Sequence, residues 1–101
     1  PLELNNHFQV YQMYSILLDN EEVRDKLQKH LSDNGVMSKV YFYPVHLKTL
    51  YQRDYNCKVG DLKITEELSK RVLTMPLYPD LNKEQLDYMI DIINQFFSHV
   101  N

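Results

Sequence analysis

The chain has 101 residues, 44% hydrophobic and 25% charged, a balance that fits one globular domain and excludes an intrinsically disordered protein. Its formal net charge is −3 and its basic residues form no patch of the kind that binds nucleic acid, while no apolar stretch approaches the ~20 residues of a membrane span. A single cysteine, Cys57, allows no internal disulfide, which agrees with a reducing cytoplasm. We therefore expect a small cytoplasmic domain with neither a nucleic-acid nor a membrane partner.

The first predicted element is a strand over residues 8–18, where aromatic and β-branched residues are enriched. Apolar side chains occupy both alternating faces, so we expect a central strand that is covered on both sides. Asp19 and Asn20 then offer an N-cap for a helix, which Gly35 ends because glycine readily adopts the left-handed conformation that follows many helices. The buried face of this helix is predicted from residues that recur every four positions: Val23, Leu27 and Leu31.

The middle of the chain predicts a second strand over residues 36–43, which are rich in valine and aromatic residues. Pro44 should end this strand, because proline cannot donate a hydrogen bond to a sheet. Helical spacing of apolar residues from Leu47 to Tyr51 predicts a short helix, and the polar residues 52–62 predict a loop.

A further helix is predicted to begin with Thr65 as its N-cap, followed by Glu66 and Glu67, whose charges suit the positive end of the helix dipole. Residues 73–78 then predict a short extended segment, since a residue that precedes proline, here Met75, prefers an extended conformation.

The last helix has the clearest start signal in the chain. Asn82 is a good N-cap, and Gln85 stands three residues later, as in a capping box. Ile92 and Phe96 widen the apolar stripe of this helix, so we expect it to touch a second surface besides its own sheet. The main apolar face is predicted to consist of Leu86, Met89, Ile90, Ile93 and Phe97.

In chain order these elements predict an α+β fold, a two-layer small domain with helices packed on one face of a small, mostly antiparallel sheet. The other face of that sheet would be apolar, so in a complete protein something should cover it. Two alternatives remain open from the residues alone. The chain could be a stand-alone α+β module that binds a ligand or a protein, or a domain that self-associates through its uncovered face.

Two segments carry a family resemblance. Residues 34–47 read Asn-Gly-Val-Met-Ser-Lys-Val-Tyr-Phe-Tyr-Pro-Val-His-Leu, and residues 64–81 contain Ile-Thr-Glu-Glu-Leu-Ser and later Val-Leu-Thr-Met-Pro-Leu-Tyr-Pro-Asp-Leu. In this order and spacing, they resemble the C-terminal domain of the DegT/DnrJ/EryC1/StrS family of sugar aminotransferases, which depend on pyridoxal phosphate. The resemblance covers about residues 7–97, nearly the whole chain.

The resemblance implies that residues 1–101 are the C-terminal small domain of a larger aminotransferase of fold type I. In the family, the large domain holds the cofactor phosphate and the lysine that forms the Schiff base, and no motif here matches it. We therefore expect pyridoxal phosphate in the full-length parent and none bound to this chain, which alone should not be catalytic. The parent, expected to be a homodimer, would transfer an amino group, from glutamate, to a nucleotide-linked keto sugar for polysaccharide or secondary-metabolite biosynthesis.

Tyr41, Tyr43 and His46 are the predicted substrate-binding residues, and no catalytic or metal-binding residue is predicted. In a strand, the two tyrosines would point to the same face, beside the turn that Pro44 stiffens. The resemblance implies that this turn faces the active site, where hydroxyl and imidazole groups suit a sugar hydroxyl or a nucleotide diphosphate. From the residues alone, the tyrosines could equally pack the sheet while His46 bonds a local backbone group. Lys48 is interpreted as a solvated helix residue, because a Schiff-base lysine needs burial or a neighbouring cation.

The remaining reactive side chains predict no further site. His7, His30 and His99 are too scattered for a metal site, and Cys57 is interpreted as an inert loop thiol. The segment 53–60, which is mixed in charge, is either a specificity or dimer-contact loop or an ordinary solvated connection.

Overall fold

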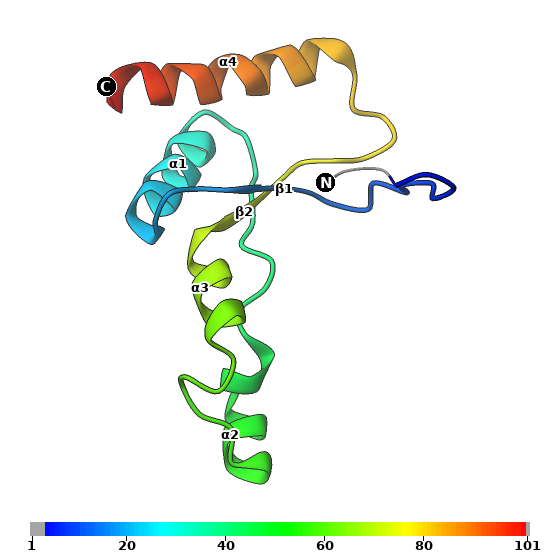
Figure 1. The fold of residues 1–101 in the computed structure, drawn as a ribbon. Helices are drawn as coiled ribbons and strands as arrows, with labels where there is room; N and C mark the ends of the chain where they lie inside the picture. The colour runs from blue at the N-terminus through cyan, green and yellow to red at the C-terminus, as the bar shows by residue number, and fades with distance from the viewer. Residues whose placement is uncertain (1–3, 101) are drawn as a thin grey trace.

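The computed structural model describes residues 4–100, with side chains described up to residue 98. It confirms an α+β fold whose small sheet is antiparallel and whose helices pack around it (Figure 1). In chain order, the elements are β1 (Tyr14–Leu17), α1 (Glu21–Asp33), the 3-10 turn η1 (Val45–Leu47), α2 (Thr49–Tyr55), α3 (Lys63–Arg71), β2 (Val72–Met75) and α4 (Lys83–Val100).

The sheet is centred on β2, which β1 flanks on one side in a register that pairs Ser15 with Thr74. The two side-chain hydroxyls of this pair lie 2.7 Å apart, within hydrogen-bond distance. On the other side of β2, the backbone of Lys39 exchanges two hydrogen bonds with Thr74, of 2.7 and 3.0 Å. Thr74 is consequently buried and satisfied from both sides, while its neighbour Leu73 is fully buried.

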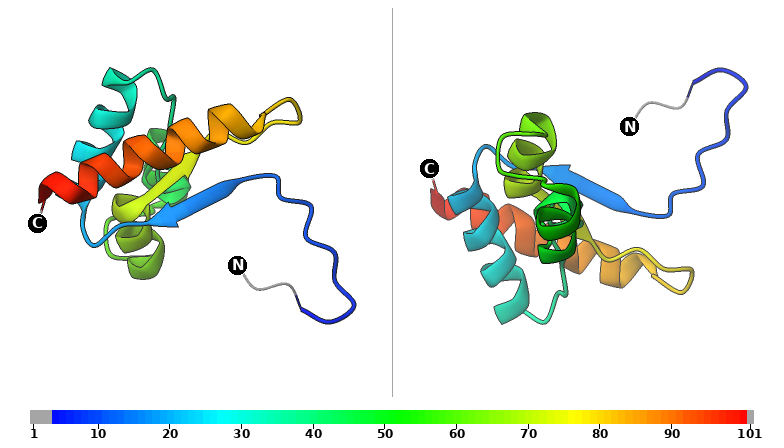
Figure 2. Two further views of the ribbon diagram at one scale, coloured as in Figure 1. Left: turned by 90° about the horizontal axis from the view of Figure 1, so that it is seen from above. Right: turned by 90° about the horizontal axis from the view of Figure 1, so that it is seen from below.

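The predicted strand over residues 8–18 is wrong in its length, since only Tyr14–Leu17 pair with β2. The segment before it extends away from the body of the molecule (Figure 2), and Phe8 is 86% exposed. Tyr11 has a φ of 47°, in the left-handed region that interrupts a strand. The periodic pattern therefore predicted side-chain alternation but not the number of available backbone partners.

The predicted second strand over residues 36–43 is also wrong, because it shrinks to a single bridge at Lys39. β2 ends before Pro76, which has no N–H to extend a ladder. Farther along, α2 continues to Tyr55, into the segment that was predicted to be a loop. The predicted N-cap Thr65 lies inside α3, which begins at Lys63.

The predicted start signals of α1 and α4 are confirmed, since both act within one turn of helix. The Asn20 side chain accepts the Val23 N–H at 3.0 Å, and Gly35 follows α1 with a φ of 75°. At α4, Asn82 accepts the Gln85 N–H at 2.9 Å while Gln85 accepts the Asn82 N–H at 3.1 Å, a complete capping box.

The apolar face of α4 is rotated from the predicted one. Met89 is buried as predicted, but Ile92 and Phe96 are buried with it, whereas Leu86, Ile90 and Phe97 remain exposed. Contacts with α1 set this rotation, because His30 donates from Nε2 to the Ile92 carbonyl at 3.1 Å. The Tyr88 hydroxyl likewise donates to the Asn34 carbonyl at 3.0 Å. The side chains that were predicted to widen the stripe therefore form the core face, and α4 does present a second apolar surface.

The molecule has a body and an arm. The body contains α1, the sheet and α4, and it holds the core residues Leu18, Leu27, Leu31, Val36, Leu73, Met75, Met89, Ile92 and Phe96. The arm consists of η1, α2 and α3, which extend together from the sheet (Figure 1). Neither α2 nor α3 contributes a buried side chain. Because the arm and the segment before β1 both extend from the body, the Cα radius of gyration, 16.4 Å, exceeds the value of about 13 Å for a compact domain of this size.

We expect Leu27→Ala to lower the free energy of unfolding by about 2–5 kcal/mol, because it leaves a cavity between α1 and the rest of the core. Ile64→Ala in the arm is the matched control, and its exposed position predicts a change within about 0.5 kcal/mol. Urea unfolding of the chain followed by circular dichroism measures both changes. Equal losses in the two variants would contradict this division into body and arm.

Candidate functional site

The candidate site is the turn at the start of the arm, residues 44–47, which follows the bridge at Lys39. Its 3-10 geometry comes from two backbone hydrogen bonds of 3.0 Å, from the Leu47 N–H to the Pro44 carbonyl and from the Lys48 N–H to the Val45 carbonyl. Pro44 is buried at the start of this turn with a φ of −54°, which its ring favours. His46 points inward, and only 8% of the residue is exposed.

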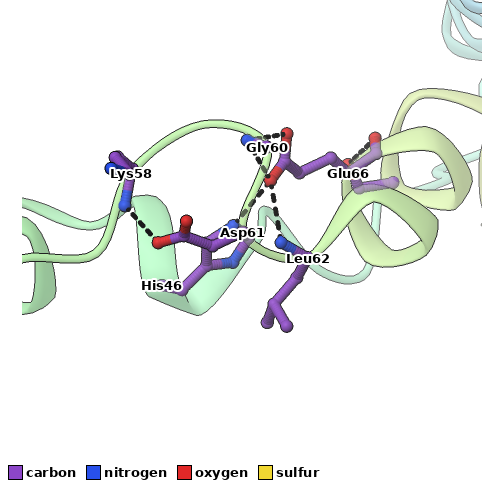
Figure 3. A network of polar contacts seen from close by, with 7 residues as sticks. His46, Lys58, Gly60, Asp61, Leu62 and Glu66 are labelled. Carbon is purple, nitrogen blue, oxygen red and sulfur yellow. Dashed lines mark hydrogen bonds and ion pairs between the residues drawn. The ribbon is translucent and has the colours of Figure 1, made fainter.

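The His46 ring binds Glu66, which lies four positions into α3. His46 Nε2 lies 2.9 Å from Glu66 Oε1, and the Glu66 side chain is only 14% exposed. The same carboxylate accepts the Gly60 N–H at 2.9 and 3.0 Å and the Leu62 N–H at 3.3 Å (Figure 3). One carboxylate therefore joins the turn, the loop and the helix of the arm.

These contacts lower the pKa of Glu66. The hydrogen bond from His46 is the largest cause, and the Gly60 and Leu62 N–H groups and the charge on His46 act in the same direction. Partial desolvation of the carboxyl group opposes them. The ionised carboxylate is consequently the form that the arm stabilises.

The conformation of the loop between α2 and α3 directs the Gly60 and Leu62 N–H groups toward Glu66. Gly60 has a φ of 95°, a conformation that side chains with a β-carbon rarely adopt. The Lys58 N–H donates to the Asp61 carboxylate at 2.8 Å, and the Asp61 N–H donates back to the Lys58 carbonyl at 3.2 Å. This compact turn holds the Gly60 N–H toward Glu66 (Figure 3).

Tyr43 is the exposed aromatic side chain of the turn, with 54% of the residue accessible. Lys48 Nζ lies 4.4 Å from the centre of its ring, at cation–π distance. The ring borders a depression of about 470 Å³, named here the Tyr43 pocket, whose walls also include Pro44, Val59 and Glu66. The turn thus presents an aromatic face, a hydroxyl group and a cation to solvent.

Arg24 closes the far side of the Tyr43 pocket and is a buried charge that the sequence analysis did not identify. Its guanidinium donates to Asp25 at 2.6 Å and to the Ser69 carbonyl at 3.2 Å, and lies 3.5 Å from Glu21. These contacts tie α1 to α3. Its position three residues before Leu27, on the buried face, was the available sequence signal.

Tyr41 lies apart from Tyr43, contrary to the prediction that both share a face. It borders a groove of about 400 Å³ on the sheet, together with Gln12, Lys39, Thr74 and Tyr78. The physical reason is the missing strand, since alternation places residues i and i+2 on one face only in extended, paired backbone. The structure thus brings His46 together with Glu66 and places the two tyrosines at different depressions.

The lysines of the chain do not provide the surroundings that a Schiff base with pyridoxal phosphate requires. All eight lysine side chains are exposed, including Lys48. A reactive lysine needs a lowered pKa from burial or a nearby cation. The only glycines, Gly35 and Gly60, lie in separate loops and form no glycine-rich cradle for a phosphate. The residues of this chain therefore do not fit the cofactor as a binding site.

The other histidines and the cysteine have local partners where their side chains are described. His7 Nδ1 lies 3.1 Å from the Asn5 carbonyl, and His30 bridges α1 and α4. The side chain of His99 lies outside the described residues, and Cys57 is a half-buried free thiol. Within the described part, histidine, cysteine and acidic side chains form no group of three that could hold a metal ion. No helix among residues 4–100 combines the length and apolarity needed to cross a membrane.

The chain matches the model of the DegT/DnrJ/EryC1/StrS aminotransferase family over residues 2–94. It is 35% identical to GDP-perosamine synthase of Escherichia coli O157:H7 over 96 residues, which are 95% of this chain and 25% of that enzyme. It is 32% identical to dTDP-4-amino-4,6-dideoxy-D-glucose transaminase of Escherichia coli, over 73% of this chain and 21% of that enzyme. The chain thus spans about a quarter of the length of these curated relatives.

Solved structures are similar over most of the chain. A DegT/DnrJ/EryC1/StrS aminotransferase from Brucella abortus is 35% identical with a TM-score of 0.70, over 83% of this chain and 22% of that one. The aminotransferase TlmJ from Streptoalloteichus hindustanus has a TM-score of 0.86 at 24% identity, over 100% of this chain and 26% of that one, which establishes a shared fold.

We expect acid to weaken the wild-type chain more than Glu66→Gln. Because the pKa of Glu66 is lowered in the folded chain, its carboxylate stabilises the fold above the ordinary glutamate pKa of about 4.3. This contribution is lost as the pH falls through the lower, folded-state value. Urea midpoints at neutral pH and at several values below about pH 5 test this sign. Glu67→Gln is the control, because the side chain of Glu67 is 61% exposed. Identical pH profiles for wild type and Glu66→Gln would refute the contribution of Glu66 to stability.

Proposed function

The chain belongs to the DegT/DnrJ/EryC1/StrS aminotransferase family, and on this premise we propose that it forms the C-terminal, substrate-facing domain of a sugar aminotransferase. The observation that carries the proposal is a family match over residues 2–94 in a chain that spans only a quarter of its relatives. The exposed lysines support assigning the chemical step to the remainder of the parent. The task of this domain is then to bind and orient the substrate.

The proposed reaction of the parent moves an amino group from glutamate to a nucleotide-linked keto sugar. The names of two relatives, a GDP-perosamine synthase and a dTDP-aminosugar transaminase, support this substrate class. Pyridoxal phosphate, held outside this chain, would supply the electron sink for that transfer. The enzyme would act in the cytoplasm, in the biosynthesis of polysaccharides or secondary metabolites, which agrees with a single, unpaired cysteine.

The proposed substrate wall is the turn and its approach, with Tyr41, Tyr43 and His46 as its binding residues. Tyr43 offers a ring face and a hydroxyl group beside the Lys48 cation, a combination that suits a sugar ring carrying a nucleotide diphosphate. Tyr41 borders the neighbouring groove on the sheet and would contact a separate part of the same long substrate. His46 lies beneath the surface, so its share would come from the one ring nitrogen that lacks a partner among the described residues, Nδ1.

We propose that the large domain of the parent covers the apolar surface beside α4. The parent enzyme would be a homodimer. A groove of about 330 Å³ runs between the sheet and α4, lined by Ile16, Leu77, Leu86 and Ile90 among other apolar side chains. Apolar grooves on isolated domains usually mark contact surfaces. A radius of gyration above that of a compact domain agrees with a piece shaped to lie against a larger body.

The isolated chain should not transaminate and should not retain pyridoxal phosphate. A chimera with the rest of a relative should transaminate and should retain the cofactor. In the chimera, this chain replaces the matched quarter of the Escherichia coli O157:H7 GDP-perosamine synthase. Amino-sugar formation and the cofactor absorbance after desalting are the measurements. An absorbance band that survives desalting of the isolated chain and maps to one lysine would overturn the assignment of the cofactor to the rest of the parent.

Within that chimera, Tyr43→Ala should raise KM about fivefold with little change in kcat, because loss of an aromatic contact removes binding of roughly 1 kcal/mol. Tyr43→Phe separates the hydroxyl group from the ring. Tyr55→Ala on α2 is the matched control, since Tyr55 is also exposed and does not line the Tyr43 pocket. If Tyr43→Ala and Tyr55→Ala leave the same KM, the turn is not part of the substrate wall.

A further inference from the structure

Three segments of the arm converge on one carboxylate. Glu66 in α3 receives Nε2 of His46 from the turn and the N–H groups of Gly60 and Leu62 from the loop. We propose that Glu66 is a positioning residue of the candidate site, which fixes the loop 57–62 against the turn 44–47 and holds His46 with Nε2 as its donor. It acts through these groups rather than on a substrate, because protein donors already occupy its oxygens.

Because the arm has little buried apolar surface, these polar contacts determine how its segments are oriented. In a hydrophobic core, packing of apolar side chains fixes the elements, but α2 and α3 contribute no buried side chain. The apolar residues Leu50, Leu62, Ile64 and Leu68 of this region are all exposed. The loop is therefore oriented mainly by hydrogen bonds, of which those to a charged acceptor are the strongest. Val59, on the same loop, is part of the wall of the Tyr43 pocket, so Glu66 also sets the shape of that pocket.

The geometry also determines the tautomer of His46. An ionised carboxylate can only accept hydrogen bonds, so Nε2, which lies 2.9 Å from Oε1, must carry the hydrogen. Nδ1 is then the other nitrogen of the ring, buried and without a hydrogen bond to any described residue. In the neutral ring this Nδ1 is an acceptor.

This tautomer sharpens the proposed function, on which the following step rests. If the turn faces the substrate, the neutral His46 ring would contact it through Nδ1 as an acceptor, once the substrate displaces the atoms that now cover Nδ1. An acceptor nitrogen binds a sugar hydroxyl group and does not bind a phosphate oxygen, which has no hydrogen to donate. The chemistry assigned to the neutral His46 ring is therefore recognition of a sugar hydroxyl, which leaves the diphosphate to cations such as Lys48.

The test compares Glu66→Gln with Glu67→Gln in the 101-residue chain by amide hydrogen exchange in NMR. The Gly60 and Leu62 amides should exchange about tenfold faster in Glu66→Gln, because their acceptor loses its charge and one of its two oxygens. Amides in the core of α1 should not change. Glu67→Gln should leave all of these amides as in wild type. Equal exchange of Gly60 and Leu62 in the two variants, with the core intact, overturns the proposal.

The unmodified chain provides a second measurement, in case Glu66→Gln does not fold. At a pH high enough to keep the His46 ring neutral, its ¹⁵N chemical shifts should show a protonated, pyrrole-type Nε2 and a pyridine-type Nδ1. The opposite tautomer would overturn the proposal without any variant. His46→Gln, whose amide group can still donate to Glu66, should keep Gly60 protected, whereas His46→Phe should not.

The chimeric aminotransferase separates this proposal from the proposed function. Glu66→Gln there should raise KM severalfold while Glu67→Gln does not, and His46→Gln should raise KM although the loop stays protected. A chimera that is inactive with the wild-type chain, while the isolated chain shows the expected tautomer and amide protection, would refute the proposed function and leave the positioning role of Glu66 standing. Altered amide protection without altered KM would refute the role of Glu66 in the site.

Discussion

The pairing of β2 is the constraint on which the rest of the structure depends. Its residues are bonded on one side to β1 and on the other to Lys39, and Leu73 at its centre is fully buried. Because α3 ends at Arg71 and β2 begins at Val72, no linker separates the arm from the sheet. Arg71 reinforces this junction, since its backbone carbonyl accepts the Leu18 N–H at 3.0 Å and its side chain donates to the Leu18 carbonyl at 2.7 Å. The direction of the arm therefore follows from the direction of one short strand.

The arm and the body are stabilised by different kinds of interaction. The body is a small hydrophobic core with polar contacts at its edges, such as the hydrogen bond from His30 to α4. The arm is attached to the body through hydrogen bonds from Arg24 to the Ser69 carbonyl and from Arg71 to the Leu18 carbonyl, and the Glu66 carboxylate holds the parts of the arm together. This division explains why the candidate site is at their junction. The turn follows Lys39, which is paired with the sheet of the body, and its His46 side chain bonds Glu66 of the arm.

The starts of α1 and α4, which depend on neighbouring residues, were predicted correctly, whereas the lengths of the strands, which depend on distant residues, were not. The caps at Asn20 and Asn82 were predicted correctly, because the residues that form them lie within one helical turn. The strands were predicted too long, because alternation in residues 8–18 and 36–43 says nothing about how many partners the backbone will find. Proline after Met75 and the left-handed Tyr11 limit that number, and only the first of these is readable from the sequence.

The candidate site was likewise predicted only in its local part. The turn with His46 was identified as the candidate, yet its partner Glu66 was attributed to the helix dipole. The contact spans 20 residues, and no local pattern connects the two. Arg24 shares the buried face of α1 with Leu27 and Leu31, and a charged residue on such a face indicates a buried partner. The sequence therefore contained a signal for the long-range contact of Arg24 with Ser69. The separation of Tyr41 from Tyr43 followed directly from the strand that did not form.

The exposed helices of the arm have a consequence for how such a domain can diverge. Substitutions at exposed positions that touch no special feature usually change stability by less than about 0.5 kcal/mol. Since α2 and α3 bury no side chain, most of their positions can vary without repacking the core. The side chains beside the turn can thus change without loss of the fold, provided that Pro44, His46, Gly60 and Glu66 are retained. The arm can therefore vary in sequence at its surface while its internal hydrogen bonds and its attachment to the sheet stay the same.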